Sequence, residues 1–205
     1  ASKENAVTLP VCLFLYEWFF FRNLDRSWLK KQLPWMGLAA VAAATLGLFL
    51  IRGTSLAKTL YDLYEQQGFT LSQRLLTQAS VIIYYIGLLF FPHPAWLNLD
   101  PDFPLSRTLA DPLSTIPALA ALCVLFSAAL LGTRRHRLCS FAILWFLVTL
   151  SIESSVIPLS LMYEHRVYLP SIFPLIALTT FVVRHIRPRI LISVVLPMAI
   201  ILGVL

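Results

Sequence analysis

Long apolar stretches alternate with short polar segments along most of the chain. The apolar stretches are residues 5–21, 33–51, 114–131, 138–157, 168–183 and 189–205. A transmembrane helix needs about 20 largely apolar residues, and these stretches reach that length or fall slightly short of it. The pattern predicts an all-α integral membrane protein, with about six transmembrane helices in a single transmembrane domain over residues 1–205.

The amino-acid composition supports this prediction and argues against a soluble protein. Hydrophobic residues occupy 59% of the 205 positions, and charged residues occupy only 13%. A soluble domain usually has about 25% charged residues, which it needs to cover its surface. The net charge of +6 would indicate a nucleic-acid partner only if the basic residues formed one patch. They lie instead in short clusters between apolar stretches, so we predict no nucleic-acid partner.

The basic clusters predict the orientation of the chain in a membrane. Three short loops contain most of the cationic residues, which are Arg22, Arg26, Lys30, Lys31, Arg134, Arg135, Arg137, Arg184, Arg187 and Arg189. Short basic loops are typical of the cytoplasmic side of a membrane protein. The segment 52–113 and the turn at 163–168 are then predicted to be extracytoplasmic.

One further apolar run, at 79–91, could be a seventh span. Its 13 residues are too few to cross a bilayer as a helix. Thr70 and Gln73 have the spacing of a capping box, in which the two residues satisfy each other's backbone N–H groups at a helix start. We therefore predict an interfacial or re-entrant helix at 71–91 that does not cross the membrane.

Two acidic residues lie within predicted spans, where a carboxylate is costly and is usually functional. Glu17 is close to the cytoplasmic end of its stretch, so we expect a structural role in which it reaches Arg22 or water. Glu153 lies near the outer end of its stretch. For Glu153, a structural and a functional role are equally compatible with the sequence.

Polar residues that could carry chemistry gather in three segments of the predicted extracytoplasmic face. They are Lys3 and Glu4 in the first segment, Asp100 and Asp102 in the second, and Tyr163, Glu164, His165, Arg166 and Tyr168 in the third. Each segment also has a structural explanation: a solvated helix end, an Asp-Pro turn, and an aromatic belt at the membrane interface.

The third segment has the clearest chemical interpretation. Arg166 is flanked by Tyr163 and Tyr168 in a short loop at the membrane face. A guanidinium binds phosphate through two parallel hydrogen bonds, so the segment predicts a phosphate clamp. The three cysteines and four histidines have no metal-ligand spacing, and we predict no metal site.

Taken in order, the segments SKENAVTLP, LYEW, NLDPDFPLS and YEHRVYLPS resemble one protein family. This family is the GT-C type of polytopic membrane glycosyltransferase, in particular the members whose transmembrane module precedes tetratricopeptide repeats. The eukaryotic members are protein O-mannosyltransferases. The resemblance covers essentially the whole chain and implies the C-terminal part of a GT-C-like module.

The resemblance also implies a reaction and a location. A sugar would pass from a polyprenyl-phosphate donor to an extracytoplasmic acceptor, which could be a serine or threonine of a protein, or a glycan. The partners would be membrane lipid, the lipid-linked sugar and this acceptor, without a further cofactor. The protein would be a multi-pass protein of a bacterial inner membrane, or of the endoplasmic reticulum membrane in a eukaryote.

The resemblance and the side-chain chemistry together assign expected roles. Contacts with the donor phosphate or sugar are expected from Lys3, Glu4, Tyr163, Arg166 and Tyr168, and contacts with the acceptor or sugar from Asp100, Asp102, Glu164 and His165. In the family, an acidic residue of the first external loop often serves as the base. This loop would precede Ala1, so we expect the chain to be an inactive fragment whose catalytic residue is unknown.

Three other functions remain compatible with the sequence. They are a membrane transporter, a non-catalytic membrane scaffold, and a ligase or polymerase of lipid-linked glycans. A transporter predicts interrupted helices with polar residues near the middle of the membrane. Here the apolar stretches are mostly uninterrupted and the polar segments lie at one face, which argues against a transporter.

Overall fold

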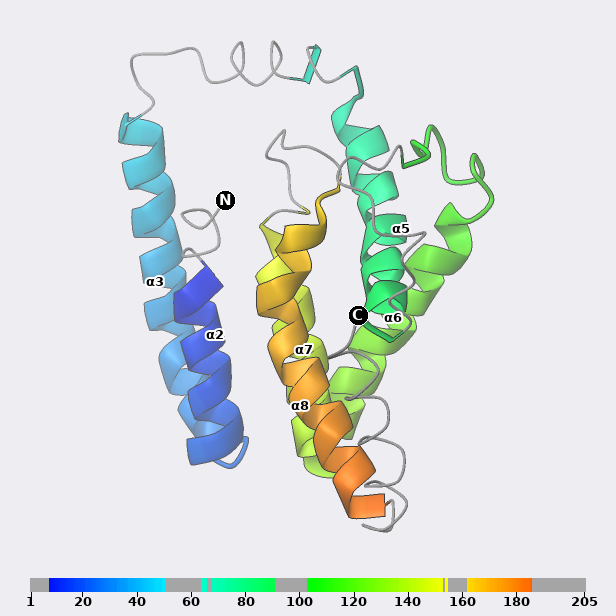
Figure 1. The fold of residues 1–205 in the computed structure, drawn as a ribbon. Helices are drawn as coiled ribbons and strands as arrows, with labels where there is room; N and C mark the ends of the chain where they lie inside the picture. The colour runs from blue at the N-terminus through cyan, green and yellow to red at the C-terminus, as the bar shows by residue number, and fades with distance from the viewer. Residues whose placement is uncertain are drawn as a thin grey trace.

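The computed structural model describes residues 8–50, 64–65, 68–90, 103–152, 154 and 162–185 (Figure 1). These residues are mostly helical, and the part described holds no strand beyond one isolated β-bridge. The longer elements are α2 (Leu9–Tyr16), α3 (Arg26–Leu50), α5 (Leu71–Phe90), α6 (Thr115–Leu131), α7 (Arg137–Ser151) and α8 (Tyr168–His185). The π-helix η2 (Glu17–Phe21) continues α2, and the short 3-10 helices η4 (Gly132–Arg134) and η5 (Glu164–Val167) precede α7 and α8.

Each predicted apolar stretch in the described part of the chain forms a helix. The stretch at 5–21 corresponds to α2 and η2, and the stretches at 114–131, 138–157 and 168–183 correspond to α6, α7 and α8. The helical class of the fold is therefore confirmed. The stretch at 189–205 lies outside the described residues.

The helix α3 begins earlier than its apolar stretch because a polar residue caps it. The Asp25 carboxylate accepts hydrogen bonds from the backbone N–H groups of Ser27 at 2.8 Å and Trp28 at 3.3 Å. These bonds satisfy donors that have no partner within the helix. They also lower the pKa of Asp25, chiefly through its bonds with Ser27. The first two turns of α3 are consequently helical although they contain Arg26, Lys30 and Lys31.

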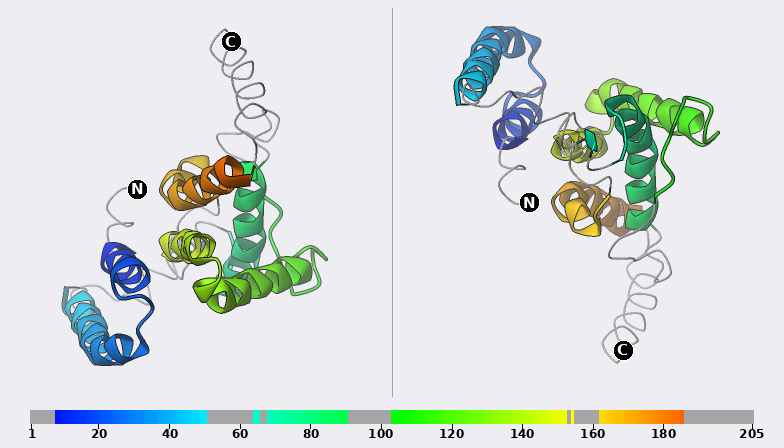
Figure 2. Two further views of the ribbon diagram at one scale, coloured as in Figure 1. Left: turned by 90° about the horizontal axis from the view of Figure 1, so that it is seen from below. Right: turned by 90° about the horizontal axis from the view of Figure 1, so that it is seen from above.

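The helices form a bundle with two chemically different ends (Figure 1). The antiparallel pair α7 and α8 lies at the centre, with α2 and α3 on one side and α5 and α6 on the other (Figure 2). One end, which we call the basic end, contains Arg22–Arg26, Gly132–Arg137 and Arg184–His185. The opposite end, which we call the polar end, contains Phe69–Thr77 and Met162–Tyr168. The described parts of the three predicted cytoplasmic loops thus lie at the same end.

The predicted capping box at the start of α5 is confirmed. The backbone N–H of Thr70 donates to Oε1 of Gln73 at 2.9 Å, and the backbone N–H of Gln73 donates to Oγ1 of Thr70 at 3.3 Å. These reciprocal bonds satisfy two N–H groups at the helix start. They explain why α5 begins at Leu71, as the sequence predicts.

After α5 the chain returns to the polar end. The backbone N–H of Ser106 donates to Oγ1 of Thr77, in the second turn of α5, at 2.8 Å. Oγ of Ser106 also lies 2.9 Å from Oγ1 of Thr115, the first residue of α6. The start of α5 and the start of α6 are therefore at the same end of the bundle. This is the geometry expected of a helix that enters and returns, whereas its position in a membrane stays a prediction.

Removal of the capping box should destabilise the start of α5. We expect Thr70→Ala to lower the free energy of unfolding by roughly 0.5–2 kcal/mol. The backbone N–H of Gln73 loses its acceptor, and the Gln73 side chain that accepts the N–H of Thr70 is held less firmly. Thermal unfolding in detergent measures the change. Thr179→Ala removes an exposed hydroxyl that donates to the carbonyl oxygen of Leu175 within α8, and it serves as the control. Equal melting temperatures for the two variants would contradict the capping role.

Two helices among the described residues are long and apolar enough to cross a membrane, Thr115–Arg134 and Tyr168–His185. Two others, Leu9–Phe21 and Arg137–Ser151, are apolar but shorter. The buried residues of α6 are small, and its large apolar side chains are exposed: Ile116, Val124, Phe126, Leu130 and Leu131. Large exposed apolar surfaces mark contacts with membrane or protein. The structure thus supports membrane association, whereas the predicted number of six spans stays a prediction.

Two apolar clusters hold the bundle together. Near the polar end, Val81 and Tyr85 of α5 pack with Phe146 and Leu150 of α7 and with Met162. Nearer the basic end, an aromatic cluster joins η2 and α2 to α7 and α8, and consists of Tyr16, Phe19, Phe20, Phe141, Trp145 and Phe173. The first cluster positions the polar site described next, and the second fixes α2 against the central pair.

Candidate functional site

Arg166 is held in a buried position at the polar end. It belongs to η5, directly before α8, and is only 8% exposed. Its guanidinium carbon lies 5.0 Å from the centre of the Tyr163 ring, within the range of a cation–π interaction. The backbone N–H of Arg166 also donates to the carbonyl oxygen of Tyr163 at 3.3 Å. The loop therefore folds back on itself so that Tyr163 covers one side of the guanidinium.

Tyr85 anchors this loop to α5. Its hydroxyl donates to the carbonyl oxygen of Tyr163 at 3.0 Å and accepts the backbone N–H of Tyr163 at 3.0 Å. A single phenol thus satisfies both backbone groups of one residue. The tyrosine is itself 2% exposed, so neither bond competes with bulk water. These two hydrogen bonds fix the backbone of Tyr163, three residues before Arg166.

Loss of the Tyr85 hydroxyl should loosen this anchor. We expect Tyr85→Phe to lower the free energy of unfolding by about 1–3 kcal/mol, because the buried hydroxyl that accepts the N–H of Tyr163 and donates to its carbonyl is lost. Thermal unfolding in detergent measures this loss. Tyr16→Phe removes the hydroxyl of an exposed tyrosine on α2 and is the control. If the two variants melt at the same temperature, the Tyr85 bonds do not stabilise the loop.

A second buried arginine lies at the same end. Arg74 is on α5, is 0% exposed, and has its guanidinium carbon 5.9 Å from the centre of the Phe69 ring. The pKa of Arg74 is lowered, chiefly by burial of its guanidinium group. An electrostatic interaction with Tyr64 raises this pKa, and the positive charge of Arg166 lowers it. Arg166 is therefore close enough to Arg74 for the two charges to interact. The planar guanidinium group of each arginine can donate two parallel hydrogen bonds to one anion.

Arg74 is buried because the inner face of α5 carries polar residues, whereas apolar residues of this helix are exposed. The buried face of this helix combines three polar residues, Arg74, Thr77 and Gln78, with Val81 and Tyr85. These positions recur every three or four residues and so share one face of a helix. Apolar residues at the start and the end of α5, by contrast, are exposed. A polar inner face and an apolar outer face are typical of helices in lipid.

The structure gives a definite position to three residues of the predicted site. Tyr163 and Arg166 are in contact with each other, whereas the predicted contacts of these residues with a phosphate stay a prediction. Tyr168 begins α8 with a side chain that is 78% exposed, and the structure does not bring it into the buried cluster. The predicted contacts of Lys3, Glu4, Asp100 and Asp102, the side chains of Glu164 and His165, and the role of Glu153 lie outside the described residues.

The sequence prediction missed Arg74 and Tyr85. The signal that could have identified them is the spacing of Arg74, Thr77, Gln78 and Tyr85 in an otherwise apolar helix. With this addition, two buried cations and two tyrosines lie at one end of the bundle. Guanidinium groups bind phosphate or carboxylate through paired hydrogen bonds. The arrangement is chemically suited to an anion that carries an apolar group.

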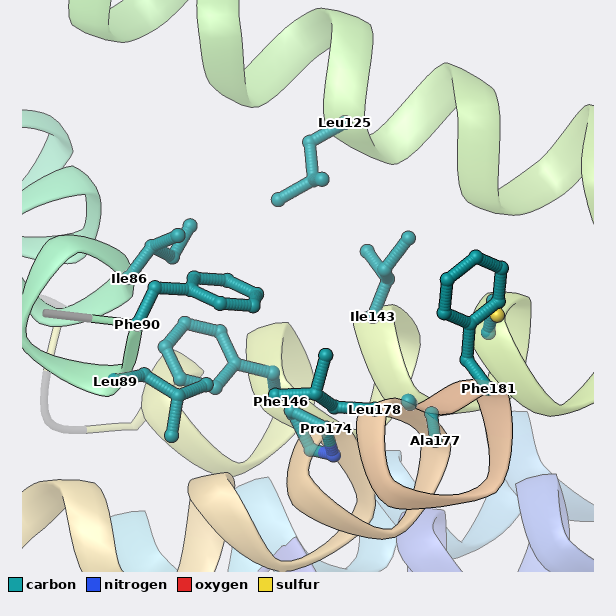
Figure 3. A pocket seen from close by; sticks show the side chains of 12 residues that line it. Ile86, Leu89, Phe90, Leu125, Ile143, Phe146, Pro174, Ala177, Leu178 and Phe181 are labelled. Carbon is teal, nitrogen blue, oxygen red and sulfur yellow. The ribbon is translucent and has the colours of Figure 1, made fainter. Parts of the chain in front are cut away.

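An apolar pocket lies nearer the basic end, between the end of α5, the middle of α6, the first turns of α7 and the last turns of α8 (Figure 3). Its volume is about 300 Å³. Phe90, Leu125, Ile143, Phe146 and Phe181 are among the side chains that line it. This volume is at the lower end of the range for small-molecule sites, roughly 300–1,000 Å³.

Glu17 contacts Arg22, as the sequence predicts. Its carboxylate oxygen lies 3.0 Å from Nη2 of Arg22, and Nε of Arg22 donates to the same oxygen at 3.0 Å. The Arg22 guanidinium also lies 5.4 Å from the centre of the Trp28 ring. Both charged side chains are partly exposed, so this ion pair contributes little to stability. Glu17 has a structural role at the turn between α2 and α3.

The resemblance to membrane glycosyltransferases rests on the sequence motifs. Comparisons of the chain with protein-family models, curated proteins and solved structures found no match.

Proposed function

We propose that the chain is part of a membrane glycosyltransferase of the GT-C type, with about six transmembrane helices. In this proposal, the protein transfers a sugar from a polyprenyl-phosphate donor to an acceptor on the extracytoplasmic side, such as a serine or threonine of a protein. The polar end faces that side, and the basic end faces the cytoplasm. The donor phosphate binds at Arg166 and Arg74.

The observation that carries the proposal is the pair of buried arginines at the polar end. Arg166 is 8% exposed and Arg74 is 0% exposed. Charged residues inside a membrane protein are costly and usually serve a substrate or ion. Arg166 also lies in the motif YEHRVYLPS, on which the resemblance rests. The buried charges and the motif thus support the same position for an anionic substrate.

The apolar surroundings of this pair support a lipid-linked anion over a soluble one. Val81 and Tyr85 of α5 and Phe146 and Leu150 of α7 form an apolar cluster below the loop of Arg166. A soluble sugar phosphate would gain little from such surroundings. The hydrocarbon part of a polyprenyl phosphate could remain in the membrane while its phosphate reaches the two guanidinium groups.

The chemistry of such a transfer explains why cations are needed. A hydroxyl oxygen of the acceptor forms a bond to the anomeric carbon of the sugar, and the bond from this carbon to the phosphate oxygen breaks. Polyprenyl phosphate leaves with the electron pair of this bond, and the acceptor proton passes to a base, expected from the resemblance to be an acidic residue. Fixed cations near the phosphate stabilise the charge that develops on it.

Binding of lipids that differ only in the phosphate tests the proposal. The purified chain in detergent would be titrated with a polyprenyl phosphate and with the polyprenol of the same length. We expect the polyprenol to bind at least about tenfold more weakly, because one hydrogen bond to a charged group is worth about 1.5–3 kcal/mol. Phosphatidylcholine is the control for unspecific lipid binding.

Two outcomes would contradict the proposal. Equal affinities for polyprenyl phosphate and polyprenol would mean that the chain binds the hydrocarbon part and does not recognise the phosphate. Binding of polyprenyl phosphate no tighter than of phosphatidylcholine would mean that no specific donor site exists. A phosphate-dependent affinity would support the donor site and would leave the nature of the acceptor to an activity assay.

A further inference from the structure

The apolar pocket and the basic end of the bundle are neighbours. Cys139 and Phe146 belong to the first three turns of α7, which begins at the basic end, and both line the pocket. Phe181 lines it from a position one turn before the end of α8. Its ring stacks on the ring of His185 with centres 4.3 Å apart. The side of the pocket nearest the basic end is thus connected to His185 through the ring of Phe181.

Cations lie directly before α7 and in the last turn of α8, the two helices that line this side of the pocket. Arg134 and Arg135 end the 3-10 turn that leads into α7, and Arg184 lies in the last turn of α8. All three side chains are exposed. Arg137 differs, because its Nη1 donates to Oδ1 of Asn23 at 2.9 Å and links α7 to the turn after η2. Arg137 therefore has a structural contact, whereas the three exposed arginines are available to a ligand.

We propose that this pocket is a binding site for an anionic phospholipid of the cytoplasmic leaflet. One acyl chain lies in the pocket, and the phosphate of the headgroup contacts Arg134, Arg135 and Arg184. Charge complementarity selects this occupant, because a zwitterionic lipid would bring its own cation to the same arginines. Basic pockets between transmembrane helices on the cytoplasmic side are suited to anionic headgroups.

The site is distinct from the proposed donor site. Arg166 lies at the polar end and precedes α8, whereas Arg184 is in the last turn of this helix. The 18 residues of α8 separate the two ends by about 27 Å, at 1.5 Å of rise per residue. The inference rests on the membrane location included in the proposed function, but it does not depend on the transfer reaction.

The cysteines of the chain provide a direct test. Cys139 is exposed and lines the pocket, and Cys123 is exposed on α6 but does not line it. The full chain in a nonionic detergent would be treated with N-ethylmaleimide, and mass spectrometry would give the alkylation rate of each thiol. We expect phosphatidylglycerol, added to the micelles, to slow alkylation of Cys139 several-fold and to leave Cys123 unchanged. Phosphatidylcholine should have little effect on either thiol.

Variants that lack one or two arginines identify the residues that bind the lipid headgroup. We expect Arg134→Gln combined with Arg135→Gln to abolish the protection of Cys139 by phosphatidylglycerol. Arg26→Gln combined with Lys30→Gln removes the same charge from α3, away from the pocket, and should leave the protection intact. If the first double variant does not fold, Arg184→Gln is the second test of the same contact and should reduce the protection.

A filled pocket provides a further variant. Leu178 lines the pocket and is partly exposed, so Leu178→Trp adds volume there without replacing a buried residue. Cys139 should then react slowly with or without phosphatidylglycerol. A lipid effect that is unchanged in Leu178→Trp would place the lipid elsewhere and would overturn the proposal.

Several results with the unmodified chain or the charge variants would also overturn it. One is equal protection by phosphatidylcholine, which would exclude recognition of charge. Others are no protection by either lipid, and loss of protection in the α3 variant as well. Protection by polyprenyl phosphate but not by phosphatidylglycerol would assign the pocket to the donor. The donor site has its own measurement, the effect of Arg166 on polyprenyl phosphate binding, so the two proposals can fail separately.

Discussion

Replacement of Arg166 with alanine is expected to weaken binding of polyprenyl phosphate by about 30-fold or more, since truncation of one partner of a buried charge pair costs about 2–5 kcal/mol. The expectation follows from the 8% exposure of Arg166, which leaves little water to replace the lost cation. Titration of the purified chain in detergent measures the change. Arg26→Ala removes an exposed cation at the basic end and should leave the affinity unchanged.

A lysine at position 166 separates charge from geometry. Arg166→Lys keeps the positive charge but loses the planar fork that binds two phosphate oxygens and stacks on Tyr163. We therefore expect an affinity between those of the alanine variant and the unmodified chain. Thermal unfolding of each variant distinguishes a lost contact from a lost fold. If folded Arg166→Ala binds polyprenyl phosphate as tightly as the unmodified chain, Arg166 has only a structural role.

Arg74 tests whether the two arginines share one anion. If both contact the same phosphate, the effects of Arg74→Ala and Arg166→Ala should not add, because residues with a shared partner are coupled. The double variant would then lose less than the sum of the single losses. Additive losses would mean that the guanidinium groups act separately, and no loss in Arg74→Ala would remove this residue from the site.

The helices were the most predictable part of the fold. Long apolar stretches predicted the ends of α6 and α8 to within about two residues, because little except an apolar helix can satisfy its backbone in hydrocarbon. The capping box at Thr70 likewise predicted the start of α5, since its two hydrogen bonds are local in sequence. The sequence prediction missed the start of α3, because the first residues of this helix are polar and precede the apolar stretch. The Asp25 side chain caps the helix at this point.

The candidate site was predictable only in part because its contacts are not local. Tyr163 and Arg166 are three residues apart, so a sequence motif can contain both. The hydrogen bonds between Tyr85 and Tyr163 join residues 78 positions apart, and a short sequence motif cannot predict a contact over this distance. Arg74 was missed for the same reason. Its importance depends on which face of α5 is buried, and this is decided by the packing of α5 against α7.

Replacement of Phe141 with alanine should cause the largest loss of stability, about 3 kcal/mol. A buried phenylalanine usually costs about 3–5 kcal/mol to truncate in water, and we expect the lower limit because lipid tails are as apolar as the side chain. The ring is 0% exposed and is the centre of the aromatic cluster. Its centre lies 4.7 Å from that of Phe173, 4.9 Å from Phe20 and 5.4 Å from Phe19.

The position of Phe141 also predicts which part of the fold should loosen. Phe141 joins η2 to α7 and α8, and α3 is connected to this region through the stacking of Trp28 on Phe14. Without the ring, α2 and α3 should separate from the bundle before the other helices unfold. Trypsin should then cleave faster in the turn after Arg22. Phe126→Ala, on α6 and 48% exposed, should change neither the cleavage rate nor the melting temperature measurably. Equal cleavage rates in the two variants would mean that α2 and α3 are held to the bundle by contacts other than this aromatic cluster.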